Sequence, residues 1–240
     1  MTFKYSFLTV LSGSAMATGA VLALAGQAQA ITFTGDTAGS WGLPAIPSTS
    51  TVLSNENGGT NNRLTWGVPI IGSFSNFVQF DGLGFAAEVD RLFAIGNLSY
   101  RNGSTTDTFD GDFPLGVDIT FVSPFATDET FSYTFNILNT TNTDDPIASA
   151  DRLRFSAAGL TEDTFTFDGV EYTINLVGFS TDGGTSLVSE FNSPEGSTAQ
   201  ATLFAQITAA PLPPTPENIP EPGMLAGLAL CGLYAASRRR

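Results

Sequence analysis

The fold of this chain is decided by residues 165–176, which read FTFDGVEYTINL. Apolar and polar side chains alternate on both sides of Asp168-Gly169, and a period of two is typical of strands with one buried face. An Asp-Gly pair adopts the positive φ angles of a type I′ turn with little strain. We therefore expect a β-hairpin, with strands at residues 165–167 and 170–176.

The same alternation recurs along the central part of the chain. Residues 131–137 (FSYTFNI) place four apolar side chains on one face and three polar ones on the other, and residues 117–121 (VDITF) repeat the pattern. Eighteen of the 20 phenylalanines fall in residues 31–210, where no amphipathic helix of ten residues is evident. Shorter candidate strands are residues 31–33, 153–155 and 203–207. These patterns predict an all-β fold, an antiparallel β-sandwich of jelly-roll type with an aromatic core, and leave a closed barrel as the alternative.

The chain divides into a body between two terminal segments. Residues 31–210 are about 180 residues, which is enough for one well-filled domain. Residues 211–219 are rich in proline and predict an extended spacer. Three stretches of the body are predicted to be loops, because they are rich in Gly, Ser, Thr, Asn or Asp: residues 44–62, 102–116 and 139–150.

Charge and composition exclude several classes of function. Residues 31–222 hold all 23 acidic residues and five of the nine basic ones, so their net charge is −18. Nucleic acid and anionic lipid surfaces would repel such a body. The chain has no histidine, which excludes Ser-His-Asp and Cys-His catalysis and His-ligated zinc. Its single cysteine, Cys231, allows no intramolecular disulfide, so the core alone must stabilise the fold.

The two ends of the sequence have the composition of targeting segments. Lys4 precedes an apolar, small-residue stretch, and Ala28-Gln29-Ala30 has small residues where a signal peptidase reads them. Residues 1–30 are therefore expected to be a signal peptide cleaved after Ala30, and permanent anchoring by this stretch is the alternative. At the other end, residues 223–236 are apolar and precede Arg238-Arg239-Arg240. Such a segment is expected to stop in a membrane with its arginines in the cytoplasm.

The apolar segment is short for a membrane span. As a helix, its 14 residues reach about 21 Å, and the hydrocarbon core of a bilayer is about 30 Å thick. Together with Pro220-Glu221-Pro222 and the terminal arginines, it resembles the PEP-CTERM sorting signal of bacterial surface proteins. The resemblance implies recognition of residues 220–240 by exosortase, a membrane transpeptidase-like enzyme of bacteria that make exopolysaccharide. It also implies an exported protein that is held in the inner membrane only transiently, by a short C-terminal helix.

A second resemblance covers the body. Residues 64–67 (LTWG), 93–100 (FAIGNLSY) with Asn102-Gly103, and 172–179 (YTINLVGF) resemble the choice-of-anchor K domain. Domains of that family occur on bacterial surface proteins with varied anchors and bring no established activity. The resemblance implies an extracellular β domain.

Four groups of side chains are candidates for binding or chemistry. The carboxylates of Asp107, Asp110 and Asp112 offer oxygen ligands that Ca²⁺ accepts, and turn residues bonded to backbone amides are the alternative. The same two interpretations apply to Asp144, Asp145 and Asp151. Trp41 and Trp66, with Tyr100, offer a platform for stacking on sugars, or else belong to the core with the indole N–H bonded to backbone. A glycosidase would need a pair of carboxylates, for which the candidates are Glu88, Asp90, Glu162 and Glu171.

Three functions follow from these observations. The leading one is a non-enzymatic protein of the cell surface or extracellular matrix, without a cofactor and associated with exopolysaccharide. The second is a carbohydrate-binding module, by analogy with other sandwich domains. The third is a carboxylate-dependent glycoside hydrolase.

Overall fold

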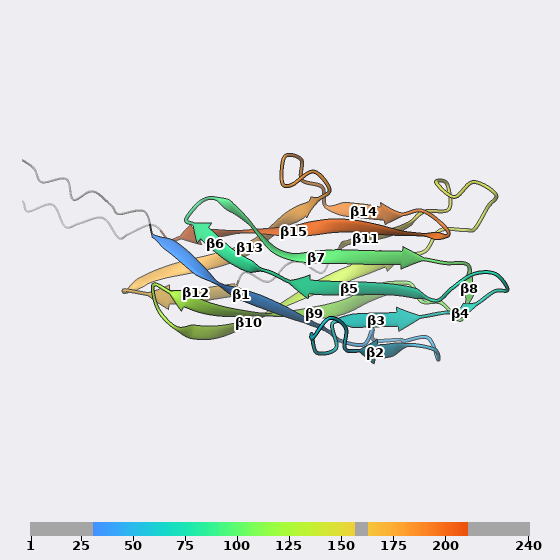
Figure 1. The fold of residues 1–240 in the computed structure, drawn as a ribbon, viewed down its shortest axis with the longest axis horizontal. Helices are drawn as coiled ribbons and strands as arrows, with labels where there is room; N and C mark the ends of the chain where they lie inside the picture. The colour runs from blue at the N-terminus through green and yellow to red at the C-terminus, as the bar shows by residue number, and fades with distance from the viewer. Residues whose placement is uncertain (1–30, 157–162, 211–240) are drawn as a thin grey trace, which may run out of the picture.

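The computed structural model describes residues 31–156 and 163–210, and it confirms the predicted antiparallel β-sandwich (Figure 1). Thirteen of the 15 described strands form two open sheets of six and seven strands, so the alternative of a closed barrel is wrong. The chain passes between the sheets several times, as in jelly-roll-like sandwiches. Within the described ranges, no helix is long and apolar enough to cross a bilayer.

The six-stranded sheet has the order β14-β11-β10-β9-β1-β6, and every neighbouring pair is antiparallel. Its longest pairing joins β9 and β10, where Phe113 lies opposite Phe135. Its strands are β1 (Thr32–Trp41), β6 (Gly84–Glu88), β9 (Gly111–Ser123), β10 (Thr127–Leu138), β11 (Asp151–Phe155) and β14 (Glu190–Ser193).

The seven-stranded sheet has the order β12-β13-β15-β7-β5-β3-β2 and is also antiparallel. Its centre pairs β15 with β7, two strands that are far apart in the sequence. Its strands are β2 (Val52–Ser54), β3 (Arg63–Trp66), β5 (Asn76–Gly82), β7 (Leu92–Asn102), β12 (Asp163–Phe167), β13 (Val170–Ser180) and β15 (Ser197–Ala209). The short strands β4 (Val68–Pro69) and β8 (Thr105–Thr106) pair with each other.

The hairpin predicted from FTFDGVEYTINL is confirmed. Phe167 lies opposite Val170, and Asp168 and Gly169 between them have φ angles of 50° and 76°, as a type I′ turn requires. Both angles are positive, which glycine adopts without strain and aspartate tolerates better than most residues.

The loop predictions were right in one case and partly wrong in two. Residues 139–150 contain no strand, as expected. Residues 44–62 contain β2, and residues 102–116 contain β8 and the first part of β9. Glycine and proline in GDFPLG concealed the alternation that buries Phe113 and Leu115.

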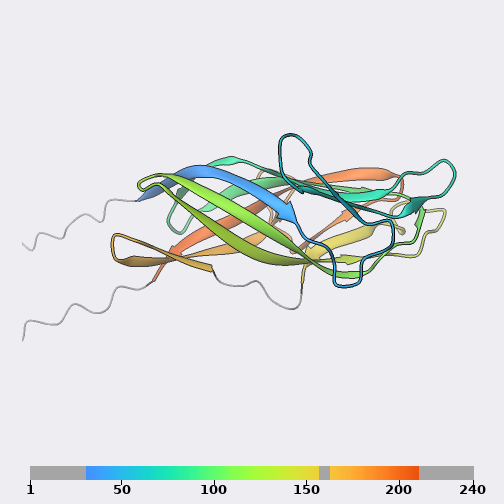
Figure 2. The ribbon, with the colours of Figure 1, turned by 90° about the horizontal axis from the view of Figure 1, so that it is seen from below.

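Aromatic rings fill the space between the sheets. Phe33 on β1 is fully buried and makes edge contacts, with ring centroids 5.4 Å from Phe165 and 5.1 Å from Tyr172 on the opposite sheet. These contacts join the two sheets without a disulfide. The start of β1 and the end of β15 lie at the same end of the molecule, whereas β4 and β8 lie at the other end (Figures 1 and 2).

Candidate functional site

The outer surface of the seven-stranded sheet carries the most extensive set of ordered polar side chains that we find. The alternation along β5 points Val78 and Phe80 into the core, so Gln79 and Asp81 face outward. On β7, Leu98 and Tyr100 are likewise fully buried.

Register places these outward residues in three rows across the sheet. In the first row, Asp81 lies opposite Asn97, which lies opposite Thr202, and the Thr202 Oγ1 hydroxyl donates to Asn97 Oδ1 at 2.9 Å. The second row joins Gln79, Ser99 and Gln200, and the third joins Phe77, Arg101 and Thr198. We call these nine residues the polar face: Phe77, Gln79, Asp81, Asn97, Ser99, Arg101, Thr198, Gln200 and Thr202.

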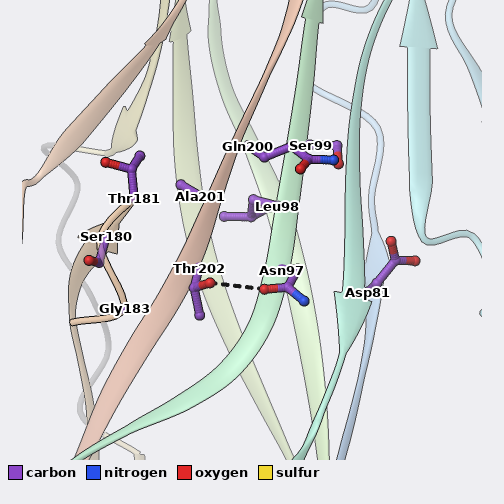
Figure 3. Close-up of a pocket in the computed structure, with 10 residues that line it drawn as sticks. All are labelled: Asp81, Asn97, Leu98, Ser99, Ser180, Thr181, Gly183, Gln200, Ala201 and Thr202. Atoms are coloured by element: carbon purple, nitrogen blue, oxygen red, sulfur yellow. Dashed lines mark hydrogen bonds between the residues drawn. The ribbon is translucent and has the colours of Figure 1, made fainter.

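A groove of about 380 Å³ lies over this polar face (Figure 3). All of the first row and, from the second row, Ser99 and Gln200 line it, together with Ser180, Thr181 and Gly183. A second hollow of about 360 Å³ lies on the other side of Asp81, beside Asn57 and Gly58. Hydroxyl and carboxamide groups both donate and accept hydrogen bonds, so the groove is suited to a ligand rich in hydroxyl groups.

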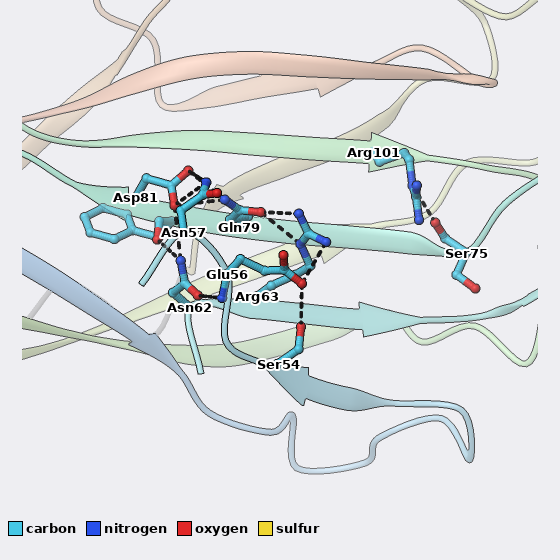
Figure 4. Close-up of polar contacts among 10 residues, drawn as sticks. Ser54, Glu56, Asn57, Asn62, Arg63, Ser75, Gln79, Asp81 and Arg101 are labelled. Atoms are coloured by element: carbon cyan, nitrogen blue, oxygen red, sulfur yellow. Dashed lines mark hydrogen bonds and ion pairs between the residues drawn. The ribbon is translucent and has the colours of Figure 1, made fainter. Parts of the chain in front are cut away.

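A hydrogen-bond network fixes one end of the polar face (Figure 4). The Gln79 Nε2 amide donates to both oxygens of Asp81, at 2.8 and 2.7 Å, and Arg63 Nε donates to Gln79 Oε1 at 2.9 Å. Arg63 also forms an ion pair with Glu56, in which Nη1 and Oε1 are 3.0 Å apart. These bonds hold the Asp81 carboxylate in place at the border of the groove.

The structure does not bring the predicted calcium ligands together. Asp107 accepts hydrogen bonds from Thr49 Oγ1 at 2.6 Å and from the Ser50 amide at 2.8 Å, and the bond from Thr49 is the main cause of its lowered pKa. Asp110 accepts from the Asn139 amide at 2.6 Å. Asp112 accepts from Asn136 Nδ2 and Ser156 Oγ, each at 2.6 Å.

The alternative interpretation, turn residues bonded to backbone amides, holds in part: Asp107 and Asp110 accept from backbone amides of segments distant in sequence, whereas Asp112 accepts from side chains. Within the described ranges, no three carboxylate, histidine or cysteine side chains are grouped so that they could hold a metal ion. Calcium binding by the three aspartates therefore stays a hypothesis that this grouping does not support.

Asp145 and Asp151, from the second predicted group of aspartates, also bond to different partners. Asp145 accepts from the Ile147 amide at 2.9 Å, which is a local turn contact. Asp151 is 3% exposed and accepts from the Thr140 amide at 2.8 Å and the Tyr100 hydroxyl at 3.2 Å. Burial raises the pKa of Asp151 to about 6. Asp151 lies two positions before the buried Leu153 on the same strand, and this spacing is the sequence pattern that indicates an inward-facing Asp151.

The sugar-stacking hypothesis is wrong for the two tryptophans. Trp41 is 2% exposed and Trp66 is fully buried, so neither ring offers a face to a ligand. Trp41 packs against Phe113 with ring centroids 5.1 Å apart, and Trp66 packs against Phe109 at the same distance. The core interpretation holds, except that neither Nε1 group has a hydrogen-bond partner among the described residues.

The carboxylates considered for a hydrolase lie on separate elements. Glu88 ends β6, Asp90 lies in the turn before β7, and Glu171 lies near the start of β13. Glu162 lies outside the described residues, and the carboxylate pair stays a hypothesis.

Several predicted sites lie outside the described residues. They are the signal cleavage at Ala28 and Ala30, the spacer at 211–219, the apolar segment at 223–236, and the sorting residues Pro220, Glu221, Pro222, Arg238, Arg239 and Arg240. No protein-family model matches this chain. A search of curated proteins likewise gives no match. The two family resemblances therefore remain expectations.

Proposed function

We propose that this chain is an exported, non-enzymatic protein of the cell surface or extracellular matrix whose sandwich associates with exopolysaccharide. The observation that carries the proposal is the arrangement of the sequence: two segments with the composition of targeting signals flank a single acidic body without histidine. The β-sandwich fold of that body is consistent with an extracellular domain.

The proposed route has three steps. Signal peptidase cleaves after Ala30, and the apolar residues 223–236 hold the exported chain in the inner membrane for a time. An exosortase-like enzyme then recognises Pro220-Glu221-Pro222 and releases or transfers the body. Arg238, Arg239 and Arg240 supply the positive charge that keeps the tip in the cytoplasm.

The groove over the polar face favours carbohydrate binding as the molecular activity of the displayed body. Its lining offers side-chain amide and hydroxyl groups from β7, β13 and β15 and the Asp81 carboxylate from β5, and groups of these kinds bind sugar hydroxyls. Binding of this kind would associate the protein with a polysaccharide matrix without any catalysis.

Cell fractionation and intact mass measurement test the route. The native chain should reach the surface fraction with both terminal segments cleaved. Deletion of residues 223–240 should leave the protein in the periplasm or the medium. Replacing Arg238, Arg239 and Arg240 by glutamine should impair sorting, and replacing them by lysine is the matched control, because lysine retains the charge. The proposal fails if the deleted chain is retained at the surface unchanged, or if the full-length chain accumulates uncleaved in the cytoplasm.

A further inference from the structure

Arg101 is a basic residue of the outer sheet surface that has no carboxylate partner among residues 31–156 and 163–210. Arg63, on the same surface, is paired with Glu56. In the part of the chain that the structure describes, the other ion pair joins Arg152 and Glu190, and no carboxylate lies within 4.0 Å of Arg101. No ion pair with a described carboxylate therefore offsets the charge of Arg101, although the body has a net charge of −18.

The Arg101 guanidinium is also held in a defined orientation. Its Nε group donates to the Ser75 carbonyl at 2.9 Å (Figure 4). Its central carbon lies 4.7 Å from the ring centroid of Phe74 and 4.6 Å from that of Phe77. The two terminal nitrogens have no hydrogen-bond partner among the described residues. A stacked, oriented guanidinium loses little conformational entropy when it binds an anion.

Electrostatics around the guanidinium favour an incoming anion. Burial of Arg101, and then the nearby charge of Arg63, lower the pKa of Arg101 below its usual value. Both effects oppose the positive charge, and a bound carboxylate would offset them. The planar fork of an arginine matches one carboxylate through two parallel N–H···O bonds.

The rest of the polar face restricts the ligand further. Arg101 lies four positions after Asn97 along β7, which is about 13 Å at the rise of a strand. A saccharide that extends from Arg101 to Asn97, in the far row of the groove, therefore contains several sugar units. At the groove, the Asp81 carboxylate would repel a second acidic sugar, whereas it would accept hydrogen bonds from a neutral one.

We propose that the polar face binds an acidic heteropolysaccharide, with Arg101 holding the carboxylate of a uronic acid and the groove holding neutral sugars of the same chain. This inference rests on the proposed association with exopolysaccharide and names the class of polysaccharide. A dense polyanion does not fit, because one free guanidinium cannot offset its repulsion by the acidic body.

Calorimetric titration of the full-length protein at low ionic strength tests the inference. The probes are aldotetraouronic acid, which carries one uronate on three neutral sugars, and neutral xylotetraose and tetragalacturonate. We expect aldotetraouronic acid to bind at least tenfold more tightly than the other two. The Arg101→Gln variant should lose this preference, and Arg101→Lys should retain only part of it.

Arg91→Gln is the matched control. Arg91 is exposed and lies just before the opposite end of β7, so its replacement removes the same charge away from the free guanidinium. This variant should bind aldotetraouronic acid like the native chain. Far-ultraviolet circular dichroism confirms that each variant is folded.

The possible failures are distinguishable. Equal affinity for aldotetraouronic acid and xylotetraose, or an unchanged preference in Arg101→Gln, overturns the role of Arg101 and leaves the association with polysaccharide standing. Tighter binding of tetragalacturonate overturns the role of Asp81 and the assignment to a heteropolysaccharide. Equally effective competition by inorganic phosphate identifies a general anion site and also overturns the assignment. Binding to none of the three probes overturns this inference together with carbohydrate binding by the groove.

Discussion

Replacing Asp151 by asparagine tests whether one buried carboxylate makes the stability of this sandwich depend on pH. Asp151 begins β11, is 3% exposed, and is bonded to the Thr140 amide and the Tyr100 hydroxyl. Burial opposes ionisation and raises the pKa to about 6, although these hydrogen bonds act in the opposite direction. The folded protein is therefore expected to bind a proton at Asp151 at a higher pH than the unfolded chain does.

The sign of the effect follows from proton linkage. The usual pKa of 3.8 applies to Asp151 in the unfolded chain. Between about pH 4 and pH 6 the folded protein binds a proton at Asp151 that the unfolded chain has lost. The contribution to stability is therefore fully present below about pH 4 and is lost as the pH rises through 6. A change of pKa from 3.8 to about 6 corresponds to at most about 3 kcal/mol.

Urea denaturation at pH values from 4 to 8 measures this contribution. Asparagine cannot ionise, so the free energy of unfolding of Asp151→Asn, minus that of the native chain, should increase by up to about 3 kcal/mol between pH 4 and pH 7. The control is Asp128→Asn, which removes a carboxylate at an exposed position and should give a difference constant within about 0.5 kcal/mol. A difference for Asp151→Asn that stays flat or decreases over this range would refute the reasoning.

Three further predictions concern the core and the hairpin, and urea denaturation measures each. Phe33→Ala should lower the free energy of unfolding by about 3–5 kcal/mol, because Phe33 is fully buried among rings from both sheets. The control Val122→Ala, at a side chain that is 63% exposed, should lower it by less than about 0.5 kcal/mol. Similar decreases in the two variants would contradict the packing argument. Gly96→Ala should lower the free energy of unfolding by about 1–3 kcal/mol, because a Cβ there would lie 2.1 Å from the Phe80 ring. The same substitution should have a smaller effect in a chain that also carries Phe80→Leu. If the effects of the two substitutions simply add, the two residues are not coupled. Gly169→Ala should lower the free energy of unfolding by about 1 kcal/mol, because Gly169 has a φ of +76°, which alanine adopts only with strain. Gly169→Asn should lower it by less, because asparagine tolerates positive φ better. The reverse order would argue against the type I′ turn.

Sequence reasoning predicted the strands whose two faces differ in polarity. Residues 117–121 and 131–137 lie within β9 and β10, and residues 165–176 form the hairpin. It did not predict β5, which reads NFVQFDG and is buried on both faces over most of its length. The outward Phe77 is covered by the guanidinium groups of Arg63 and Arg101, so no alternation appears in the sequence.

The polar face could not be predicted, because it depends on register between distant strands. Asn97 and Thr202 share a row although 105 residues separate them. For Asp107, Asp110 and Asp112, in contrast, closeness in sequence predicted a shared site, but these aspartates bind different segments. Proximity along the chain indicates a shared site only when the backbone turns those side chains toward one point.

The two faces of the seven-stranded sheet are under different physical constraints, and this difference identifies where recognition is to be tested. Inward residues such as Val78 and Leu98 are fixed by the requirement to fill the core, so their identity carries information about packing. Folding constrains the outward residues much less, since an exposed ion pair contributes only about 0–1 kcal/mol. Stability therefore does not account for why Arg63 has an acidic neighbour and Arg101 does not. The open guanidinium, fixed between two phenylalanine rings beside a groove lined by amides and hydroxyls, is instead the arrangement that a ligand with one carboxylate and many hydroxyl groups would require.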